Sequence, residues 1–408
     1  MAHVWSPDRR RFLLGGSALI AASRAGIAQG LRPLKIGVLN DMSSVYSDFQ
    51  GIGSVVAAQL AVEDFSARLG VPVEIVSADH QNKPDVGAAI ARRWFDTENV
   101  DVIMDLPNSA VALAVLAVAE EKNKAVIGSG AGSSVMTGPK CSKNFVHWTY
   151  DTYSSGTALG KALTEAGGKT WFFVTADYSF GKDMEANCAA AIEASDGKVL
   201  GSVRHPLNTP DFSSFLLQAQ GSGADVVAFA NGGGDTNGCF KQAHEFALTP
   251  KQTLAGFTLN VTNVPALGLD ILAGALMPTA FYWDANEGTR AFGKRFLAAH
   301  PKKIMPNDMQ AGMYGATAHL LKAMAQTKSA ADGVKLVDAM KAIPTDDPLF
   351  GKGKIRADGR AMHPIYLYKA KSPAESKYDW DDFALVSTIK PEDAFRPLDK
   401  GGCPFIKA

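Results

Sequence analysis

Short apolar runs alternate with longer stretches of helical periodicity along most of this 408-residue chain. In order, they predict a strand at 34–39, a helix at 51–69, a strand at 73–78, a helix at 85–95, a strand at 100–104, a helix at 109–121 and a strand at 125–127. The alternation restarts with predicted strands at 171–175, 199–203, 226–230 and 253–256. Because helices separate the strands, the connections must be crossovers, which produce parallel sheets covered on both faces. The strand runs are continuously apolar, as is typical of strands buried on both sides.

This pattern forms two blocks, at about 31–148 and 149–278, and therefore predicts two α/β domains with doubly wound parallel sheets. Predicted helices at 289–299, 311–325 and 330–342 follow, then a Gly/Lys-rich hairpin and a strand at 365–369. We expect the last 35 residues to be irregular and to lie on the surface. The chain is too long for one hydrophobic core, which also favours two domains.

The first 28 residues have the layout of an export signal. Arg9, Arg10 and Arg11 precede an apolar Gly/Ala-rich stretch that ends at Ser23, a pattern of the twin-arginine type. The stretch is shorter than the ~20 apolar residues that span a bilayer, and no Cys stands at the cleavage point for a lipid anchor. We predict cleavage near Ala28 and a periplasmic protein. The alternative is a basic N-terminal arm on a cytoplasmic protein.

The charges are balanced, with 41 basic and 41 acidic side chains and no block of like charge. This balance gives no indication of nucleic acid or an anionic membrane surface as a partner. We expect neither.

Four cysteines allow three complete pairings. Cys141 and Cys403 lie in loops that contain Gly and Pro, whereas Cys188 and Cys239 fall inside predicted helices as small buried residues. In an oxidising compartment the two loop cysteines are the favoured disulfide. The sequence has no CxxC motif or His/Cys cluster, and we expect neither a metal nor a cofactor.

Small and polar residues follow the predicted strands, where ligands bind in open parallel sheets. Asn108 and Ser109 stand at the start of a predicted helix, whose free N–H groups favour an anion. The simpler interpretation is that they only cap this helix. The neighbouring loop holds Gly130, Ala131 and Gly132, which let the backbone approach a ligand closely. Two such loops together can clamp a carboxylate.

Aromatic and polar side chains near other strand ends complete the candidate site. In the first block and just after it they are Tyr46, Phe49, Tyr150 and Tyr153. In the second block the loops at 175–181 and 231–235 contribute Phe180, Asn231 and Asp235. A single aromatic residue is more often part of the packing than of a ligand wall, so we expect about half of the aromatics to line the site.

Catalytic motifs are absent from the sequence. Gly167–Thr170 resembles a phosphate loop, but Leu163 stands where its first glycine belongs. The HExxH pattern fails at Leu248, and there is no Gly-x-Ser-x-Gly elbow. We therefore expect a binding protein and not an enzyme.

The chain resembles the substrate-binding proteins of ABC importers, in the branched-chain amino-acid-binding or type I periplasmic binding protein family. The resemblance is carried by the order and spacing of several segments, among them LKIGVLNDMSS, VIMDLPNSA, VIGSGAGSSVMTG and WFFVTADYSFGKD. It implies two lobes joined by a three-stranded hinge, which close on a ligand. It places the crossovers near 149, 280 and 349, so lobe 1 is 31–148 plus 281–348, and lobe 2 is 149–280 plus 349–408.

The family resemblance also assigns roles to residues. It gives the loops at Asn108–Ser109 and Gly130–Gly132 the ligand carboxylate, and it puts Phe180 where the family has a tyrosine before glycine. Amino-acid binders use an acidic side chain after a later strand to pair with the ligand ammonium, and the matching position here is Thr258. A buried ammonium without a counter-charge is costly. Asp235 is an alternative source of that charge.

These departures favour a small carboxylate without an ammonium group, either an aromatic or phenylpropanoid acid or a 2-oxo acid, bound by hinge closure. The alternative ligand is a branched-chain or other amino acid. From the resemblance we expect a monomer that docks transiently on an ABC permease in the inner membrane. A ligand sensor that regulates a partner protein is the alternative class, and an exported chain without an appended signalling segment argues against it.

Overall fold

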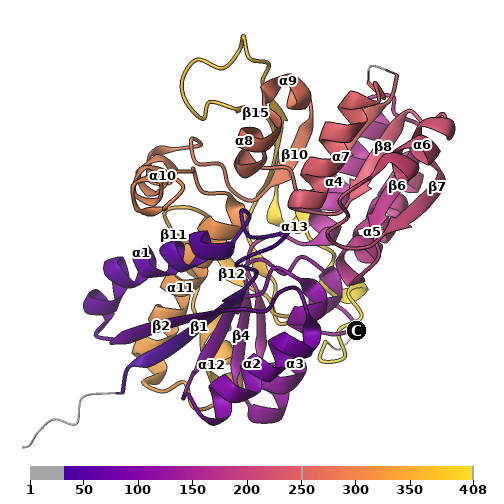
Figure 1. Cartoon of the computed structure of the whole chain (residues 1–408). Helices are drawn as coiled ribbons and strands as arrows, with labels where there is room; N and C mark the ends of the chain where they lie inside the picture. The colour runs from indigo at the N-terminus through magenta and orange to yellow at the C-terminus, as the bar shows by residue number, and fades with distance from the viewer. Residues whose placement is uncertain (1–31, 250, 407–408) are drawn as a thin grey trace, which may run out of the picture. The chain divides into compact units, whose positions relative to one another are not determined.

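The computed structural model describes residues 32–249 and 251–406 (Figure 1). The predicted export signal lies outside the described residues. The first sheet has the order β2-β1-β3-β4-β5 with every pair parallel. Its strands are β1 (Leu34–Asn40), β2 (Val73–Asp79), β3 (Val102–Asp105), β4 (Ala125–Gly128) and β5 (Phe145–His147). The helices between them are α1 (Gly51–Leu69), α2 (Pro84–Asp96) and α3 (Ser109–Lys122), and the 3-10 helix η1 (Ser134–Thr137) precedes β5.

The second sheet repeats this arrangement with the order β7-β6-β8-β9, again parallel throughout. Its strands are β6 (Thr170–Ala176), β7 (Lys198–His205), β8 (Val226–Ala230) and β9 (Thr253–Gly256). The helices of this part are α4 (Thr152–Glu165), α5 (Ser179–Ala194), α6 (Ser213–Gly221) and α7 (Gly234–Glu245). Two doubly wound parallel sheets are the predicted fold class, which is confirmed.

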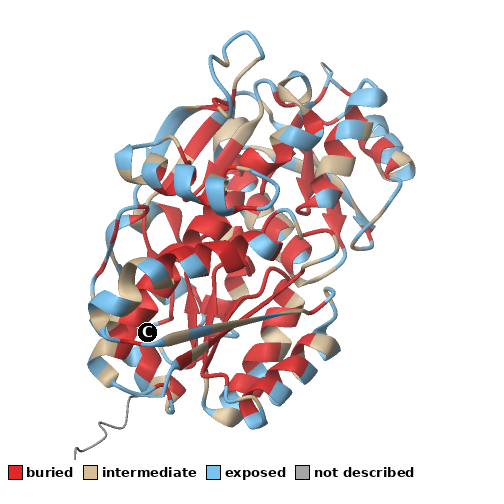
Figure 2. Cartoon of the chain, turned by 60° about the vertical axis from the view of Figure 1, so that its left-hand side comes forward, coloured by how far each residue is buried: buried red, intermediate tan, exposed pale blue. Residues whose placement is uncertain are grey.

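The pattern of buried residues explains these elements. All residues of β3, β4 and β8 are buried, as their continuous apolar sequences predict. Helix α2 buries Ile90, Ala91 and Trp94 on one face, and Trp94 packs so closely on β1 that a Cβ at Gly37 would stand 2.4 Å from its ring. Figure 2 shows the same division, with buried residues on the strands and exposed residues on the outer faces of the helices.

After β9 the chain builds two small antiparallel sheets and a group of helices. The short helices η2 (Val261–Asn263), α8 (Val264–Leu267) and α9 (Leu269–Leu272) lead to β10 (Leu276–Thr279), α10 (Glu287–Ala299), α11 (Asp308–Thr327) and α12 (Gly333–Ala342). The remaining elements are β11 (Thr345–Asp347), β12 (Gly351–Ile355), β13 (Ala361–Met362), β14 (Ile365–Ala370), β15 (Phe383–Ile389), α13 (Pro391–Ala394) and η3 (Leu398–Lys400). Strands β10, β14 and β15 form one antiparallel sheet, and β11, β12 and β13 form another.

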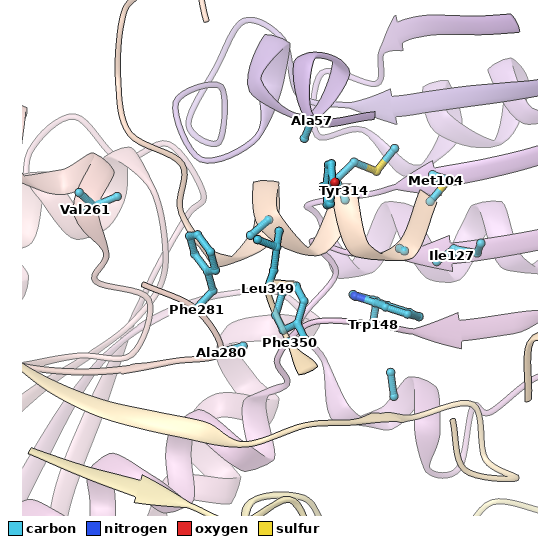
Figure 3. Close-up of a cluster of buried hydrophobic side chains, with 14 of the residues drawn as sticks. Ala57, Met104, Ile127, Trp148, Val261, Ala280, Phe281, Tyr314, Leu349 and Phe350 are labelled. Atoms are coloured by element: carbon cyan, nitrogen blue, oxygen red, sulfur yellow. The ribbon is translucent and has the colours of Figure 1, made fainter. Parts of the chain in front are cut away.

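Helix α11 returns to the first sheet and packs along α1, so the last third of the chain completes the first hydrophobic core (Figure 1). Figure 3 shows part of that core, where Tyr314 of α11 lies among side chains from the first sheet and from the connecting segments. Phe281 and Phe350, on two different connections, have ring centroids 6.4 Å apart. The predicted lobe boundaries remain a prediction, but residues far apart in the sequence share this core.

Arg360 ties the connection after β5 to the segment before β14. Its guanidinium is fully buried and donates to the carbonyl oxygens of Thr149 and Tyr150, each at 3.0 Å. Asp151 lies 3.6 Å away, and the ring of Phe395 lies 4.6 Å beneath the guanidinium. Burial lowers the Arg360 pKa to about 10, so the group keeps its charge at neutral pH.

The structure of the last 35 residues and the pairing of the cysteines can be compared with the sequence-based predictions. The last 35 residues are not irregular throughout, because the β-branched run of β15 pairs antiparallel with β14. Cys403 forms a disulfide with Cys141, with a Cα–Cα distance of 5.5 Å. Cys188 and Cys239 are free and buried in α5 and α7.

Candidate functional site

The loops that leave the carboxyl ends of both parallel sheets enclose a cavity of about 10 Å³. This is the edge at which open parallel sheets bind ligands. The cavity has room for about one water molecule, so the loops around it are nearly in contact. Its walls are Tyr46, Phe49, Gln50, Pro107, Gly130, Tyr150, Tyr178, Phe180, Gly232, Thr258 and Met309.

Aromatic rings make most of the wall. The hydroxyls of Tyr46, from the loop after β1, and Tyr178, from the loop after β6, are hydrogen-bonded to each other across the two sheets. Phe180 stacks beside Tyr178 with centroids 6.0 Å apart, and Phe49 lies 6.5 Å from Tyr46. Burial raises the pKa of Tyr46, Tyr150 and Tyr178 above its usual value. These hydroxyls are therefore neutral and able to donate hydrogen bonds.

The glycines of the site are required by close packing. A Cβ at Gly132 would stand 2.7 Å from the ring of Phe180 and 2.8 Å from the hydroxyl of Tyr150. A Cβ at Gly130 would lie 1.7 Å from the amide nitrogen of Gln50. Real Cβ atoms do not approach so closely, so a larger residue at Gly132 would push against Phe180 from the other sheet, and one at Gly130 would displace the amide of Gln50. Ala131, between them, is buried and its carbonyl accepts from the His147 ring.

A buried carboxylate, Asp105, supports this wall. It accepts hydrogen bonds from Asn40 at 2.8 Å, from Ser129 at 2.9 Å and from the amide of Gln50. Burial raises the Asp105 pKa to about 6. The backbone at Asp105 and Leu106 has φ angles of 89° and 63°, a strained conformation for residues with side chains. Such strain is concentrated at functional sites. Here it lies in the loop that carries Pro107 of the wall and holds the amide of Gln50.

Asn108 and Ser109 support the loops of the site and do not line the cavity. Asn108 Oδ1 accepts from the backbone N–H groups of Ala110 and Val111, at 2.9 and 3.2 Å, which is a helix N-cap. Ser109 Oγ accepts from the N–H of Ser133 at 3.1 Å and so joins the start of α3 to the glycine loop. The simpler interpretation of Asn108, an N-cap, agrees with this geometry.

Of the other expected residues, Thr258 lies in the wall, while three lie outside it. Asn231 is turned into its own sheet, where its amide contacts His205 and Cys239. Asp235 accepts from the N–H groups of Asn208 and Thr209, each at 3.0 Å. Tyr153 lies under the guanidinium of Arg396 at 5.0 Å, at a separate surface groove.

Five residues of the wall were not among the expected ones: Gln50, Pro107, Tyr178, Gly232 and Met309. Four of them stand in loops that follow strands: Gln50, Pro107, Tyr178 and Gly232. The rule that ligands bind at the carboxyl ends of parallel strands therefore covers these four. Met309 stands in the first turn of α11, and nothing near it in sequence connects it with the site.

A polar cluster beside the cavity also joins the two sheets, and we name it the Asp183 cluster. Asp183, on α5, accepts from the Ser133 hydroxyl at 2.9 Å, and from the N–H and hydroxyl of Ser134 at 2.7 and 3.0 Å. The hydroxyl of Thr152 donates to the same oxygen. Arg396 donates to the Ser134 hydroxyl at 3.0 Å, so the tail held by the disulfide reaches this cluster. Ser133 and Ser134 follow the glycine loop, which places the cluster directly behind the site.

The family model for periplasmic binding proteins matches residues 33–377 of this sequence. The chain belongs to this family. A periplasmic binding protein from Burkholderia mallei is 42% identical, with a TM-score of 0.89, and the match covers 92% of this chain and 99% of that one. A branched chain amino acid ABC transporter periplasmic ligand-binding protein from Burkholderia xenovorans LB400 is 40% identical, with a TM-score of 0.79, and the match covers 91% and 99% of the two chains.

More distant proteins are also similar to this chain. The Leu/Ile/Val-binding protein homolog 6 of Brucella abortus is 26% identical, over 89% of this chain and 94% of that protein. A solute binding protein of an ABC transporter from R. palustris, solved in complex with benzoate, is 23% identical with a TM-score of 0.80, covering 92% of this chain and all of that one. The chain is thus a type I periplasmic binding protein of the ABC transporter class, as the sequence resemblance indicates.

Two further observations concern the described residues, 32–249 and 251–406. Within them no three His, Cys, Asp or Glu side chains are grouped so that they could hold a metal ion. None of the helices in these ranges combines the length and apolar character that crossing a membrane requires. The family binds small molecules for ABC permeases and is not an enzyme family.

Proposed function

We propose that this protein delivers a small carboxylate without an ammonium group to an ABC importer, either an aromatic or phenylpropanoid acid or a 2-oxo acid. The observation that carries this proposal is the wall of the cavity. Five aromatic rings and one thioether surround it: Tyr46, Phe49, Tyr150, Tyr178, Phe180 and Met309. Apolar walls with a few convergent polar groups are the usual design of a site for a small ligand. The protein from R. palustris that binds benzoate shows that this fold accommodates such an acid.

The distribution of charge supports a ligand without an ammonium group. Among the described residues that line the cavity there is no acidic side chain. Thr258 lines the cavity, and the family resemblance matches this position to the acid of amino-acid binders. Asp105 and Asp308 are buried behind the wall, and burial raises the pKa of each to about 6. A buried ammonium requires a paired counter-charge to offset its lost hydration. Thr258 instead supplies a neutral hydroxyl.

The loops with Ser109 and Gly130 to Gly132 are proposed to hold the ligand carboxylate. Gly130 of the second loop lines the cavity. Ser109 at the start of α3 stands behind it and joins the two loops through the N–H of Ser133, and a helix start of this kind favours an anion. The hydroxyls of Tyr46 and Tyr178 come from opposite sheets, so a ligand between them contacts both sides at once. A ligand that bridges both sides stabilises the closed state over the open one.

The small size of the cavity implies that the two sides of the site move apart and close again. A volume of about 10 Å³ is far smaller than an aromatic acid, so the loops must separate before such a ligand enters. The hinge segments around residues 149, 280 and 349 are proposed to bend for this motion. The closed, loaded form would then dock on a permease in the inner membrane, and we propose that the protein does so as a monomer with no catalytic activity of its own.

A branched-chain or other amino acid is the second candidate, because two similar proteins carry such names. The experiment that separates the two is a thermal-shift screen of the purified protein against aromatic acids, 2-oxo acids and amino acids. A ligand at 100 times its Kd raises the stability by about 2.7 kcal/mol, which shifts the melting temperature by a few degrees. Stabilisation by aromatic acids and not by leucine supports the proposal, and the reverse result favours the amino-acid candidate.

A further inference from the structure

One polar group in the wall of the cavity is left without a partner. Gln50, the last residue before α1, is 1% exposed and lines the cavity. Its amide nitrogen donates to Asp105. Within the described part of the chain, its carbonyl oxygen has no hydrogen-bond partner. A buried carbonyl without a donor is unfavourable, so a ligand that brings a donor to this oxygen gains from it.

The neighbours of Gln50 fix which of its two amide atoms accepts and which donates. The carboxylate of Asp105 already accepts from Ser129 at 2.9 Å and from Asn40 at 2.8 Å. Turning the amide of Gln50 by 180° would place its oxygen against the oxygen of Asp105 and lose the donated hydrogen bond. The nitrogen of Gln50 is therefore held by Asp105, and the carbonyl oxygen is the free atom.

The position of this carbonyl within the site is also defined. The nitrogen and the carbonyl oxygen of the Gln50 amide lie 1.7 and 2.4 Å from the place where a Cβ of Gly130 would stand. Gly130 belongs to the loop that, under the proposed function, holds the ligand carboxylate. The unpaired acceptor of Gln50 thus lies at the carboxylate end of the ligand and not at the far end of its ring.

We propose that Gln50 is a specificity-determining residue that selects carboxylates with a hydroxyl on the carbon next to the carboxylate, that is, 2-hydroxy acids with an aromatic group. This inference rests on the proposed function for the carboxylate itself. A 2-hydroxyl donates to the Gln50 oxygen. A 2-oxo group presents a second acceptor to it and is disfavoured. A 2-ammonium group also donates, but no acidic side chain among the described wall residues balances its charge.

The test compares ligands that differ at one position in binding to the purified full-length protein. Isothermal titration calorimetry would measure both enantiomers of mandelate, and phenylacetate, phenylglyoxylate, phenylglycine and 4-hydroxyphenylacetate. We expect one enantiomer of mandelate to bind about 30-fold tighter than phenylacetate, because the latter leaves the carbonyl unpaired. The 4-hydroxyl, at the far end of the ring, should recover less than 3-fold of this difference.

The variant Gln50→Met retains the size of the side chain and removes the acceptor. It should reduce the preference for mandelate over phenylacetate to less than about 3-fold. The matched control is Gln252→Met, which removes another buried amide whose carbonyl oxygen is unpaired, but which is held by the carbonyls of Ala219 and Ala224 away from the cavity. This control should leave the preference unchanged. The comparison of the six acids on the unmodified protein stands even if a variant fails to fold.

The possible failures are distinguishable. If none of the acids binds, the proposed function is wrong and the inference falls with it. If aromatic acids bind but mandelate and phenylacetate bind equally, the proposed function stands and the role of Gln50 is wrong. Tighter binding of phenylglycine or phenylglyoxylate than of mandelate would also overturn the role of Gln50, as would an unchanged preference in Gln50→Met.

Discussion

The Asp183 cluster is expected to set how readily the two sides of the site separate. Asp183 Oδ2 accepts four hydrogen bonds, of which three come from Ser133 and Ser134 on the side of the first sheet. The fourth donor, Thr152, opens α4 and is in the same lobe as Asp183 under the predicted boundaries. Opening the site therefore breaks the three bonds from Ser133 and Ser134 and leaves the one from Thr152 in place.

The substitution Asp183→Asn retains the shape of the side chain and removes its charge. Hydrogen bonds to a charged group contribute roughly 1.5–3 kcal/mol, and neutral ones about 1 kcal/mol. The three crossing bonds share one oxygen on a partly exposed side chain, and water replaces them on opening, so their losses do not add. We expect the closed state to lose about 1–2 kcal/mol, which corresponds to a 5- to 30-fold shift of the closed-to-open equilibrium.

Two measurements check this expectation. Small-angle X-ray scattering should show a larger radius of gyration for Asp183→Asn than for the unmodified protein, and calorimetry should show weaker binding of the acid that gave the largest thermal shift. The control is Asp177→Asn, which removes an exposed carboxylate whose ion-pair partner, Lys182, lies at 2.9 Å on the same side of the site. The reasoning is refuted if scattering and affinity are both unchanged in Asp183→Asn, or if the control has the same effect.

Three further predictions concern the loops, one buried carboxyl group and the disulfide. Ser109→Ala removes the acceptor of the Ser133 N–H, so we expect about 1–3 kcal/mol of weaker binding by calorimetry; full affinity in a folded variant would exclude Ser109 from the site. Burial raises the Asp235 pKa from 3.8 to about 7, so the folded state holds a proton that the unfolded chain releases above about pH 4. The contribution of this group to the free energy of unfolding is therefore present at low pH and is lost as the pH rises through 7. Relative to Asp235→Asn, the free energy of unfolding of the unmodified protein in urea should fall by about 2 kcal/mol between pH 5 and pH 8. Parallel pH profiles of the two proteins would contradict this. Cys403→Ser opens the bridge to Cys141 and should lower the free energy of unfolding by about 2–5 kcal/mol, whereas an identical melting temperature would show that the bridge contributes nothing.

The sequence predicted the two parallel sheets well, because fully buried strands such as β3, β4 and β8 are continuously apolar and the helices between them have clear periodicity. Short strands were missed. β5 has only three residues, and β10 contains Pro278, which weakens a strand pattern. The strand β15 was also missed, although its sequence FALVSTI is rich in β-branched residues, because its pairing with β14 depends on residues about 20 positions earlier.

For the candidate site, the sequence indicated the loops better than it selected the side chains within them. The rule that ligands lie at the carboxyl ends of parallel strands identified most of the loops that enclose the cavity, including those of Tyr46, Phe49, Tyr150 and Phe180. It could not tell that Tyr153, three residues after Tyr150, turns toward Arg396. It also could not place Met309, which reaches the site through the packing of α11 against α1. The direction of the Tyr153 side chain and the tertiary packing of α11 decide these two cases, and neither is encoded in the local sequence.

The proposed function depends on the binding of an aromatic carboxylate without an ammonium group in the cavity. The most direct measurement is calorimetric titration of the purified protein with mandelate, benzoate and leucine under the same conditions. We expect one aromatic acid to bind with a stoichiometry of one, and leucine to give no heat above dilution. Tight binding of leucine with no binding of either aromatic acid would contradict it, and would mean that Asp235, Asp308 or another acid supplies the counter-charge after the site opens.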